Sequence, residues 1–377
     1  MKKMILYSSA QLGKIKETGG VKRFKELARG LCRLCDLTVM SGDERLSFRE
    51  PIRHISMHHS RFAKNELGYA LLNWKYLLSL KKIKYDYLIS FDVPPTLWLV
   101  LLRVPHICLM VRKDLIGYEK IILNGNNRNK VIAYIKIKLL LFAEFITMIA
   151  AERIIVQCEY DKKMILKRHK FFIRKLKEKI KVQINNVNPS WEKELQVSAC
   201  SNRENGNSFV IGSINGFGDL RKGCDLFLEA AYRLIKRGED VIAFIAGDGE
   251  LIEKYKEKYK GCSRIIFLGR INEPNSFLSE VDLSVVPSRA DSCPNTIMES
   301  LFMGVPVIAS KSGGIPEILP LEEALFDLSV DSLEKKISEL IYDKSQYNSL
   351  LEKELLRKKE LEFDWCYAMF KKIIESE

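Results

Sequence analysis

The segment Leu283–Ser310 constrains the fold of this chain most, because it holds the signals of a strand, a helix and a second strand in order. The apolar run Leu283–Val286 predicts a strand that Pro287 ends. Pro294 suits the first position of a following helix, with Ser292 or Cys293 before it as the cap, and Gly304 suits the end of that helix. An apolar strand then closes the segment. This pattern predicts a layered α/β fold.

The same alternation of short apolar runs and longer helical patterns extends along the whole chain. At 377 residues the chain is too long for one ordinary core, so two doubly wound domains are expected. We place the first domain at residues 1–190, a polar linker at 191–207 and the second domain at 208–360. A last helix is expected at 361–377. The glycines and asparagines of Leu115–Lys130 predict a loop.

The start of the helix after Pro294 has the chemistry of a sugar-nucleotide site. Unpaired N–H groups and the helix dipole make such a start attractive to an anion. Asp291 lies just before it and Glu299 lies in its second turn. Carboxylates beside a phosphate site are best explained as groups that hold sugar hydroxyls. Taken alone, two acids at a helix start are common and require no ligand.

Several motifs in the second half resemble those of retaining glycosyltransferases of family four, which have the GT-B fold. The spacing of Asp291 and Glu299 matches the donor-binding signature of that family, although Glu is more common at the first position. Further matches, weakest for the last, are Lys222-Gly223, Ala246–Gly249, Gly313–Glu317 and Gly19-Gly20. The resemblance is strong over Phe209–Leu319 and loose elsewhere.

This resemblance implies two Rossmann-like domains facing across a cleft, with the last helix at 361–377 packing back on the first domain. It also implies a retaining, metal-independent transfer from a UDP- or GDP-linked sugar. It implies no cofactor besides that substrate. Glu299 would hold the ribose and Asp291 the transferred sugar. The expected donor-binding residues are Gly19, Gly20, Arg221, Lys222, Asn295 and Thr296. The expected acceptor-side residues are Arg112 and Asp114, where the family often has a His-Asp pair.

Charge is divided unevenly between the two halves of the chain. Residues 1–190 carry 37 Lys and Arg against 16 Asp and Glu, whereas residues 191–377 carry 24 against 32. The basic half predicts an anionic partner. The Lys- and Arg-rich segment Asp161–Lys181, interrupted by aromatic residues, fits either an anionic membrane surface or a solvated helix. No nucleic-acid-binding motif supports RNA or DNA as the partner.

The nine scattered cysteines predict reduced thiols in a cytoplasmic protein. Any contact of this protein with a membrane is expected to be peripheral. Neither Cys32-x-x-Cys35 nor the imidazoles of His54, His58 and His59 have the further ligands of a metal site. We therefore expect a hexosyl-type glycosyltransferase of surface polysaccharide synthesis that acts on a glycan or lipid-linked acceptor. The alternatives are a sugar-nucleotide epimerase of the same fold and a non-catalytic protein that binds a sugar nucleotide or a membrane.

Overall fold

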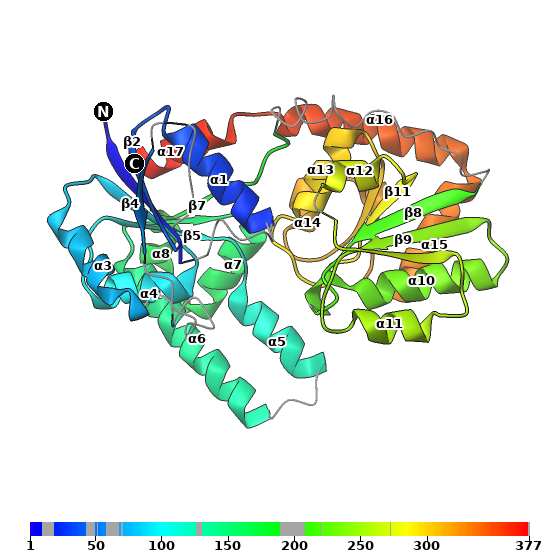
Figure 1. The fold of residues 1–377 in the computed structure, drawn as a ribbon, viewed down its shortest axis with the longest axis horizontal. Helices are drawn as coiled ribbons and strands as arrows, with labels where there is room; N and C mark the ends of the chain where they lie inside the picture. Colours follow the sequence, from blue (N-terminus) through cyan, green and yellow to red (C-terminus); the bar gives the residue numbers. More distant parts are fainter. Residues whose placement is uncertain are drawn as a thin grey trace. The chain divides into compact units, whose positions relative to one another are not determined.

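The computed structural model divides into two compact units (Figure 1). It describes residues 1–9, 19–42, 50, 52–57, 68, 71–125, 130–188, 208–218, 220–271 and 273–375. Unit 1 comprises Met1–Glu119, Asn127–Ile184 and Asp364–Glu377, and unit 2 comprises Lys120–Asn126 and Asn185–Phe363. The predicted linker at 191–207 and the residues His58 and His59 lie outside the described residues.

Unit 1 is built on a parallel sheet of seven strands in the order β3-β2-β1-β4-β5-β6-β7. The strands are β1 (Lys3–Tyr7), β2 (Asp36–Ser41), β3 (Arg53–Ser56), β4 (Tyr87–Phe91), β5 (Ile107–Val111), β6 (Arg153–Val156) and β7 (Ile180–Val182). The helices are α1 (Gly19–Leu31), α3 (Trp74–Ser79), α4 (Val93–Leu101), α5 (Leu115–Gly125), α6 (Lys130–Ala150), α7 (Glu159–Arg168), α8 (Ile173–Lys179) and α17 (Trp365–Ile374). Short 3-10 turns cover Leu80–Lys82 and Lys170–Phe172.

Unit 2 repeats the plan with six parallel strands in the order β10-β9-β8-β11-β12-β13. These strands are β8 (Phe209–Ile214), β9 (Val241–Ala246), β10 (Ile265–Gly269), β11 (Leu283–Val286), β12 (Val307–Ser310) and β13 (Leu325–Phe326). The helices are α10 (Cys224–Lys236), α11 (Ile252–Lys258), α12 (Pro274–Leu278), α13 (Asn295–Met303), α14 (Ile315–Ile318), α15 (Val330–Tyr342) and α16 (Lys344–Leu361). Short 3-10 turns cover Leu220–Lys222 and Glu322–Ala324.

The strand order reverses direction once in each sheet, between β1 and β4 in unit 1 and between β8 and β11 in unit 2. Ligands of open α/β sheets bind outside the carboxyl ends of the strands at such a switch point. The strands themselves are apolar and buried on both faces, as at Leu88, Leu109 and Val285, so they supply a rigid base for the loops that follow them. The prediction of two doubly wound domains is confirmed.

Several local predictions differ from the structure. Leu115–Gly125 is helix α5, not a loop: the Asp114 carboxylate accepts a hydrogen bond from the Gly117 N–H and so caps its first turn. His54 lies in strand β3 rather than on a helix, and its Nε2 is 2.9 Å from Ser41 Oγ. Helix α13 begins at Asn295 with Pro294 as its N-cap, one residue later than predicted.

Helix α17 belongs to unit 1 by its contacts. Asp364 caps it by accepting a hydrogen bond from the Tyr367 N–H. The Arg23 guanidinium of α1 lies 5.5 Å from the ring of Trp365, and Cys366 Sγ donates to the Glu26 carbonyl. A side chain at Gly30 would overlap Cys366, because a Cβ at that position would lie 2.2 Å from Sγ. The last helix is thus packed closely on α1.

Candidate functional site

The two loops at the switch point of unit 2 are joined by an ion pair between Lys222 and Asp291. Lys222 ends the loop after β8, and Asp291 lies in the loop after β11. The Lys222 ammonium donates to Asp291 Oδ2 at 2.6 Å, with the lysine side chain 35% exposed and the aspartate 16% exposed. The pair therefore places one cation and one carboxylate side by side at the expected ligand position of the sheet.

The backbone beside Lys222 is held in place by Gly223 and Arg289. Gly223 has φ +67°, and a Cβ there would lie 1.9 Å from the Pro287 carbonyl oxygen, so only glycine fits. Arg289 forms a bidentate pair with Asp225 at 2.7 and 2.6 Å, and it also donates to the Leu220 carbonyl. Arg289 carries no signal of this role in the sequence, because its partners lie 64 and 69 residues away.

The Gly313-Gly314 motif fixes the backbone of Asp291 from the other side. Gly313 has φ +58°, and a Cβ there would lie 2.2 Å from the Asp291 carbonyl oxygen. The Gly314 N–H donates to that carbonyl at 2.9 Å, and the Ser312 hydroxyl donates to the carbonyl of Arg289. The motif thus supports Asp291 through its main chain rather than by contributing a side chain.

Helix α13 starts shortly after Asp291. Asn295 and Thr296 are its first two residues, whose N–H groups have no acceptor four residues back within the helix. The Asn295 side-chain oxygen accepts a hydrogen bond from Asn185 at 3.3 Å. Glu299 lies one turn further on, half-buried, while Ile297 and Met298 of the same helix are fully buried. The helix start is therefore rigid.

The glycines of Ala246–Gly249 serve close packing between neighbouring loops. Gly247 has φ +141°, and a Cβ there would lie 1.7 Å from the Asn215 carbonyl oxygen. Gly249 packs in the same way on Phe217 and Gly218. Asp248 has its carboxylate 3.4 Å from Arg270, and its main-chain carbonyl accepts a hydrogen bond from Phe217. These contacts shape the loop after β8.

Beside the switch point of unit 1, at the ends of β4 and β5, the structure places a charged pair that was only half predicted. Asp92 follows β4 with φ +63° and is 1% exposed. Arg112, which follows the neighbouring strand β5, donates to its carboxylate from Nη2 at 2.6 Å, from Nε at 3.1 Å and from its main chain at 3.0 Å. Burial raises the pKa of Asp92, but Arg112 and Lys113 outweigh it and hold that pKa below its ordinary value.

Asp114, the other predicted acceptor-side residue, belongs to a buried ionic cluster. Arg168 donates to Asp114 at 3.0 Å and binds Glu144 in bidentate fashion at 2.9 and 2.7 Å. His169 Nε2 lies 2.8 Å from the same glutamate, and Glu144, Arg168 and His169 are less than a tenth exposed. The cluster ties α6 to α7, and Asp114 also caps α5. These contacts of Asp114 are thus structural, and none of them joins Asp114 to the Asp92–Arg112 pair.

Gly19 and Gly20 lie in the first turn of α1 rather than in a loop, and the residues just before them lie outside the described part. Arg221 contributes its carbonyl, which accepts a hydrogen bond from the Arg289 N–H. The structure thus brings together Lys222, Arg221, Asp291 and the start of α13. Of the residues predicted in unit 1, Arg112 follows β5, one strand beyond the switch point, and pairs with Asp92.

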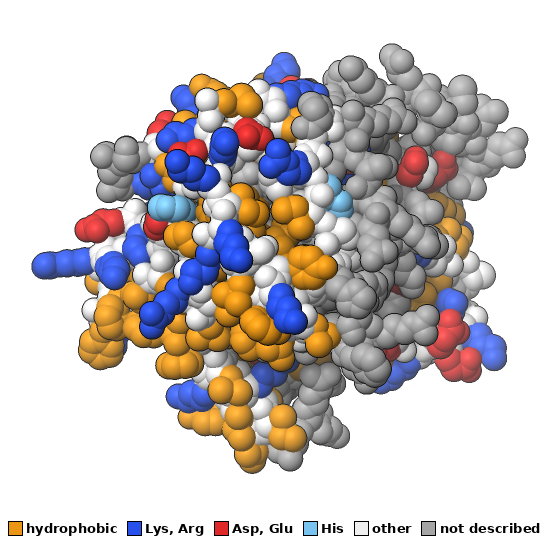
Figure 2. Space-filling model, turned by 60° about the vertical axis from the view of Figure 1, so that its left-hand side comes forward, with side chains coloured by type: hydrophobic (Ala, Val, Ile, Leu, Met, Phe, Trp, Pro, Cys, Tyr) orange, Lys and Arg blue, Asp and Glu red, His pale blue; other side chains and the backbone are white. Residues whose placement is uncertain are grey.

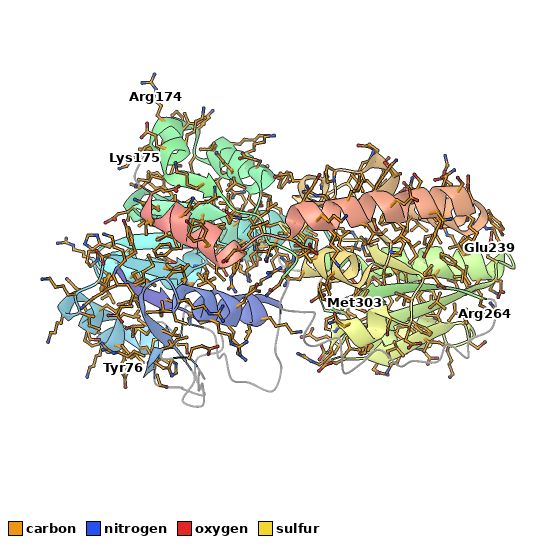
Figure 3. All side chains as sticks on the ribbon, turned by 90° about the horizontal axis from the view of Figure 1, so that it is seen from above. Tyr76, Arg174, Lys175, Glu239, Arg264 and Met303 are labelled. Carbon is orange, nitrogen blue, oxygen red and sulfur yellow. The ribbon has the colours of Figure 1, made fainter. Side chains whose placement is uncertain are left out.

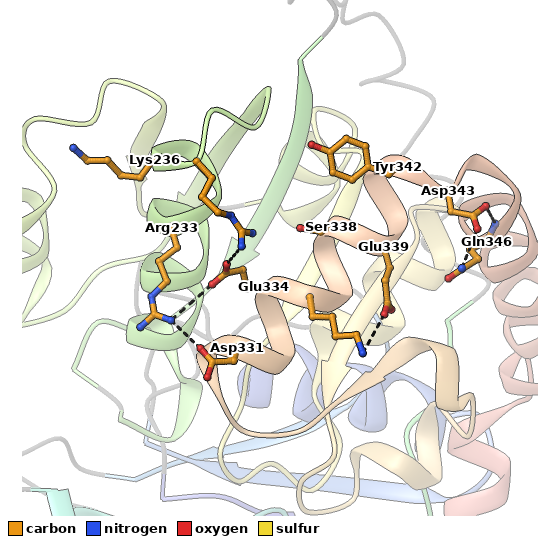
Figure 4. Close-up of a pocket in the computed structure, with 11 residues that line it drawn as sticks. Arg233, Lys236, Asp331, Glu334, Ser338, Glu339, Tyr342, Asp343 and Gln346 are labelled. Atoms are coloured by element: carbon orange, nitrogen blue, oxygen red, sulfur yellow. Dashed lines mark hydrogen bonds and ion pairs between the residues drawn. The ribbon is translucent and has the colours of Figure 1, made fainter.

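A separate cavity of about 950 Å³ lies between α10 and α15 (Figure 4). Its charged side chains are largely paired with one another: Arg233 donates to Asp331 at 2.8 Å, and Arg237 lies 2.6 Å from Glu334. The cavity is lined by α10, α15 and the start of α16, and it contains none of the predicted site residues. We therefore place the candidate site at the switch point and not here.

The second half of the chain is similar to a known protein family. Residues 208–343 match the family of group 1 glycosyl transferases. The O-antigen biosynthesis glycosyltransferase WclY of Escherichia coli is 31% identical over 112 residues, a segment that covers 28% of this chain and 28% of WclY. The chain thus matches less than a third of the length of this relative. The matched family region contains Lys222, Asp291 and Glu299.

Solved structures match the whole fold. Sucrose-phosphate synthase from Thermosynechococcus elongatus has a TM-score of 0.75 at 17% identity and covers 98% of both chains. The Anabaena protein HepE, solved in complex with UDP and glucose, has a TM-score of 0.69 at 14% identity and covers all of both chains. At such low identities the likeness shows the fold, which is the GT-B class of two parallel-sheet Rossmann-like domains.

Proposed function

We propose that this chain is a retaining glycosyltransferase of the hexosyl type. It would move a sugar from a nucleoside-diphosphate sugar to a glycan or lipid-linked acceptor during surface polysaccharide synthesis. The observation that carries the proposal is the Lys222–Asp291 pair at the switch point of unit 2, inside the region similar to group 1 glycosyl transferases. The O-antigen role of WclY supports the reaction class, and the UDP complex of HepE supports a UDP-linked donor.

In this proposal the donor diphosphate lies at the start of α13. The N–H groups of Asn295 and Thr296 and the helix dipole would face it, and Lys222 would add a full positive charge. Lys222 is more than a third exposed, so its ammonium can reach a second anion while Asp291 keeps it oriented. As the bond between sugar and diphosphate breaks, these groups would stabilise the charge that gathers on the leaving phosphate.

The two carboxylates have separate tasks in the proposal. Asp291 would accept hydrogen bonds from hydroxyls of the transferred sugar, and Glu299, one turn into α13, would hold the ribose. Because the helix start and Lys222 supply the positive charge, the transfer requires no metal ion. The acceptor attacks on the face that the leaving group occupied, and the product keeps the anomeric configuration of the donor.

The Asp92–Arg112 pair favours transfer over epimerisation. An epimerase acting on the sugar nucleotide alone needs a carboxyl or imidazole group poised to exchange a proton near neutral pH. Asp92 is instead held ionised by Arg112. Arg112, whose side chain is 22% exposed, is the member of the pair that an acceptor could reach. The proposal further places the protein in the cytoplasm, at the inner face of the plasma membrane where a lipid-linked acceptor is available.

Transfer itself is tested by incubating the purified chain with UDP- and GDP-linked sugars and extracted lipid-linked acceptors. Labelled sugar should move from the donor to the lipid fraction, at the same rate with and without a chelator. A loss of activity with chelator that manganese restores would contradict the metal-independent mechanism. Interconversion of donor sugars without an acceptor would identify an epimerase, and donor binding with no turnover would identify a binding protein.

A further inference from the structure

Helix α6 presents apolar side chains on two opposite faces. One face packs into unit 1 through Ile137 and Met148, both buried. The opposite face carries five large apolar side chains that are each between 52% and 65% exposed. We call these the outer stripe: Val131, Ile132, Ile135, Leu139 and Phe142.

The spacing of the outer stripe makes it one continuous surface. At 3.6 residues per turn its members fall within a sector of about 100° along the helix. Single exposed apolar residues are ordinary, but a contiguous apolar strip marks an interaction site. No helix among the described residues is long and apolar enough to cross a bilayer. Helix α6 therefore presents an apolar face while remaining packed on its own unit.

A second apolar group lies beside the stripe. Phe171 is 87% exposed, and Phe172 and Ile173 are 44% and 45% exposed. We call Phe171–Ile173 the aromatic tip. The ring of Phe172 lies 4.9 Å from that of Phe145 on α6, one turn beyond Phe142, so the tip continues the outer stripe. Figure 2 shows one face of the molecule, on which hydrophobic side chains gather with Lys and Arg among them.

Basic side chains surround these apolar groups. Exposed lysines and arginines on α6, α7, α8 and the turn between the last two are Lys130, Lys136, Lys138, Lys163, Lys167, Lys170, Arg174, Lys175 and Lys177. Figure 3 shows Arg174 and Lys175 pointing outward from α8. The exposed acids of α7 and α8 are Glu159 and Glu178. Arg168 does not contribute to this basic surface, because it is buried in ion pairs with Asp114 and Glu144.

We propose that the outer stripe and the aromatic tip dock on the surface of an anionic lipid bilayer. Apolar side chains of an interfacial helix enter the boundary between headgroups and acyl chains, while flanking lysines bind anionic headgroups. A second copy of the chain would bring two basic surfaces together, so the charge favours the bilayer over a dimer. The proposed docking is inferred from these residues alone. That it brings the protein to a lipid-linked acceptor rests on the proposed function.

The test measures binding of the full chain to vesicles of phosphatidylcholine with phosphatidylglycerol, and to vesicles of phosphatidylcholine alone. The stripe variant is Ile132→Ser/Ile135→Ser/Phe142→Ser. The matched control is Leu328→Ser/Leu356→Ser, which removes exposed apolar residues of unit 2. The wild type and the control should bind anionic vesicles, and the stripe variant should bind about tenfold more weakly or not at all.

A charge variant, Lys170→Gln/Arg174→Gln/Lys175→Gln, keeps the proposal testable if the stripe variant folds poorly. It should weaken binding to anionic vesicles and reduce its salt dependence. Unchanged vesicle binding by a folded stripe or charge variant overturns the proposal. The proposal is also overturned if the wild type binds no vesicles but forms a dimer in sedimentation velocity, and the stripe substitutions dissociate that dimer. Donor affinity, measured without lipid, should be equal in all variants, so failure of the docking and failure of the donor site are distinguished.

Discussion

The Lys222 ammonium lies 2.6 Å from the Asp291 carboxylate, although 69 residues separate them in the chain. The contact arises because β8 and β11 are parallel neighbours, so the loops at their carboxyl ends meet. Gly223, Arg289 and Gly313 fix those loops by main-chain contacts. The Lys222–Asp291 pair is therefore held in place within unit 2, and the proposed binding of the donor depends on it.

Replacing Lys222 by alanine should separate phosphate binding from base binding. We expect Lys222→Ala to lower affinity for a nucleoside diphosphate by about tenfold or more while affinity for the free nucleoside changes little, since charged hydrogen bonds contribute about 1.5–3 kcal/mol. Titration calorimetry with both ligands checks this. Lys256→Ala, which removes an exposed lysine of α11, is the control. Equal losses for both ligands would make Lys222 a structural residue.

Replacing Glu299 by alanine should abolish transfer without unfolding the chain. The side chain is half-buried and lies one turn into α13, where a carboxylate can hold the donor ribose. We expect donor affinity to fall by an amount equivalent to about 1.5–3 kcal/mol. The checks are turnover and melting temperature beside those of Glu257→Ala, which changes an exposed glutamate of α11. Wild-type turnover in Glu299→Ala would remove this residue from the site.

The sequence predicted the layered fold because its strands are short, apolar and bounded by proline or glycine. It also predicted the end of α13 at Gly304, and the start of that helix to within one residue. It did not predict β3, β7 and β13. These strands have four, three and two residues, and they do not form an apolar run of their own. The spacing of apolar residues does not reveal the order of the strands in a sheet. The contact between Lys222 and Asp291 could therefore not be derived from it.

Long-range partners account for the rest of the differences. The sequence places Arg168 in a basic surface segment and Asp114 on the acceptor side, because nothing near them in the chain reveals Glu144 as a neighbour of Arg168. Asp92 was missed because it follows an ordinary apolar strand, and its partner Arg112 lies 20 residues away. Charged residues after two separate strands are a signal for such a pair only once those strands are known to be adjacent.

Gly223 should tolerate no side chain. Alanine at this position requires φ +67° and places its Cβ 1.9 Å from the Pro287 carbonyl oxygen. Gly238 has φ +88° with open space around it, so Gly238→Ala carries the conformational penalty alone, about 1–2 kcal/mol. We expect Gly223→Ala to lower the melting temperature clearly more than Gly238→Ala and to weaken donor binding. Equal melting temperatures would contradict the close approach of the two loops.

Asp92→Asn should reduce stability in a pH-dependent way. The folded pKa of Asp92 is below its ordinary value of 3.8, so its ionised form stabilises the fold above that value, and this stability is lost as pH falls through the folded pKa. Asparagine is close to aspartate in size, so the backbone strain of φ 63° and ψ 160° at this position is common to both proteins. At neutral pH we expect a loss of about 1.5–3 kcal/mol.

Thermal unfolding of wild type and Asp92→Asn from pH 7 to pH 3 checks this effect. The difference between the two melting temperatures should shrink at the acid end. Asp331→Asn serves as a control, because the side chain of Asp331 is 88% exposed. A difference that stays constant across the pH range would show that the Arg112 pair does not depend on the ionised carboxylate.

Thermal unfolding with a panel of UDP- and GDP-linked sugars tests the proposed donor site in unit 2 most directly. A donor present at about 100 times its dissociation constant stabilises the folded state by about 2.7 kcal/mol. We predict that one or more nucleotide sugars raise the melting temperature of the wild type, and raise that of Glu299→Ala and Lys222→Ala much less. No shift with any nucleotide sugar, or equal shifts in all three proteins, would contradict the account.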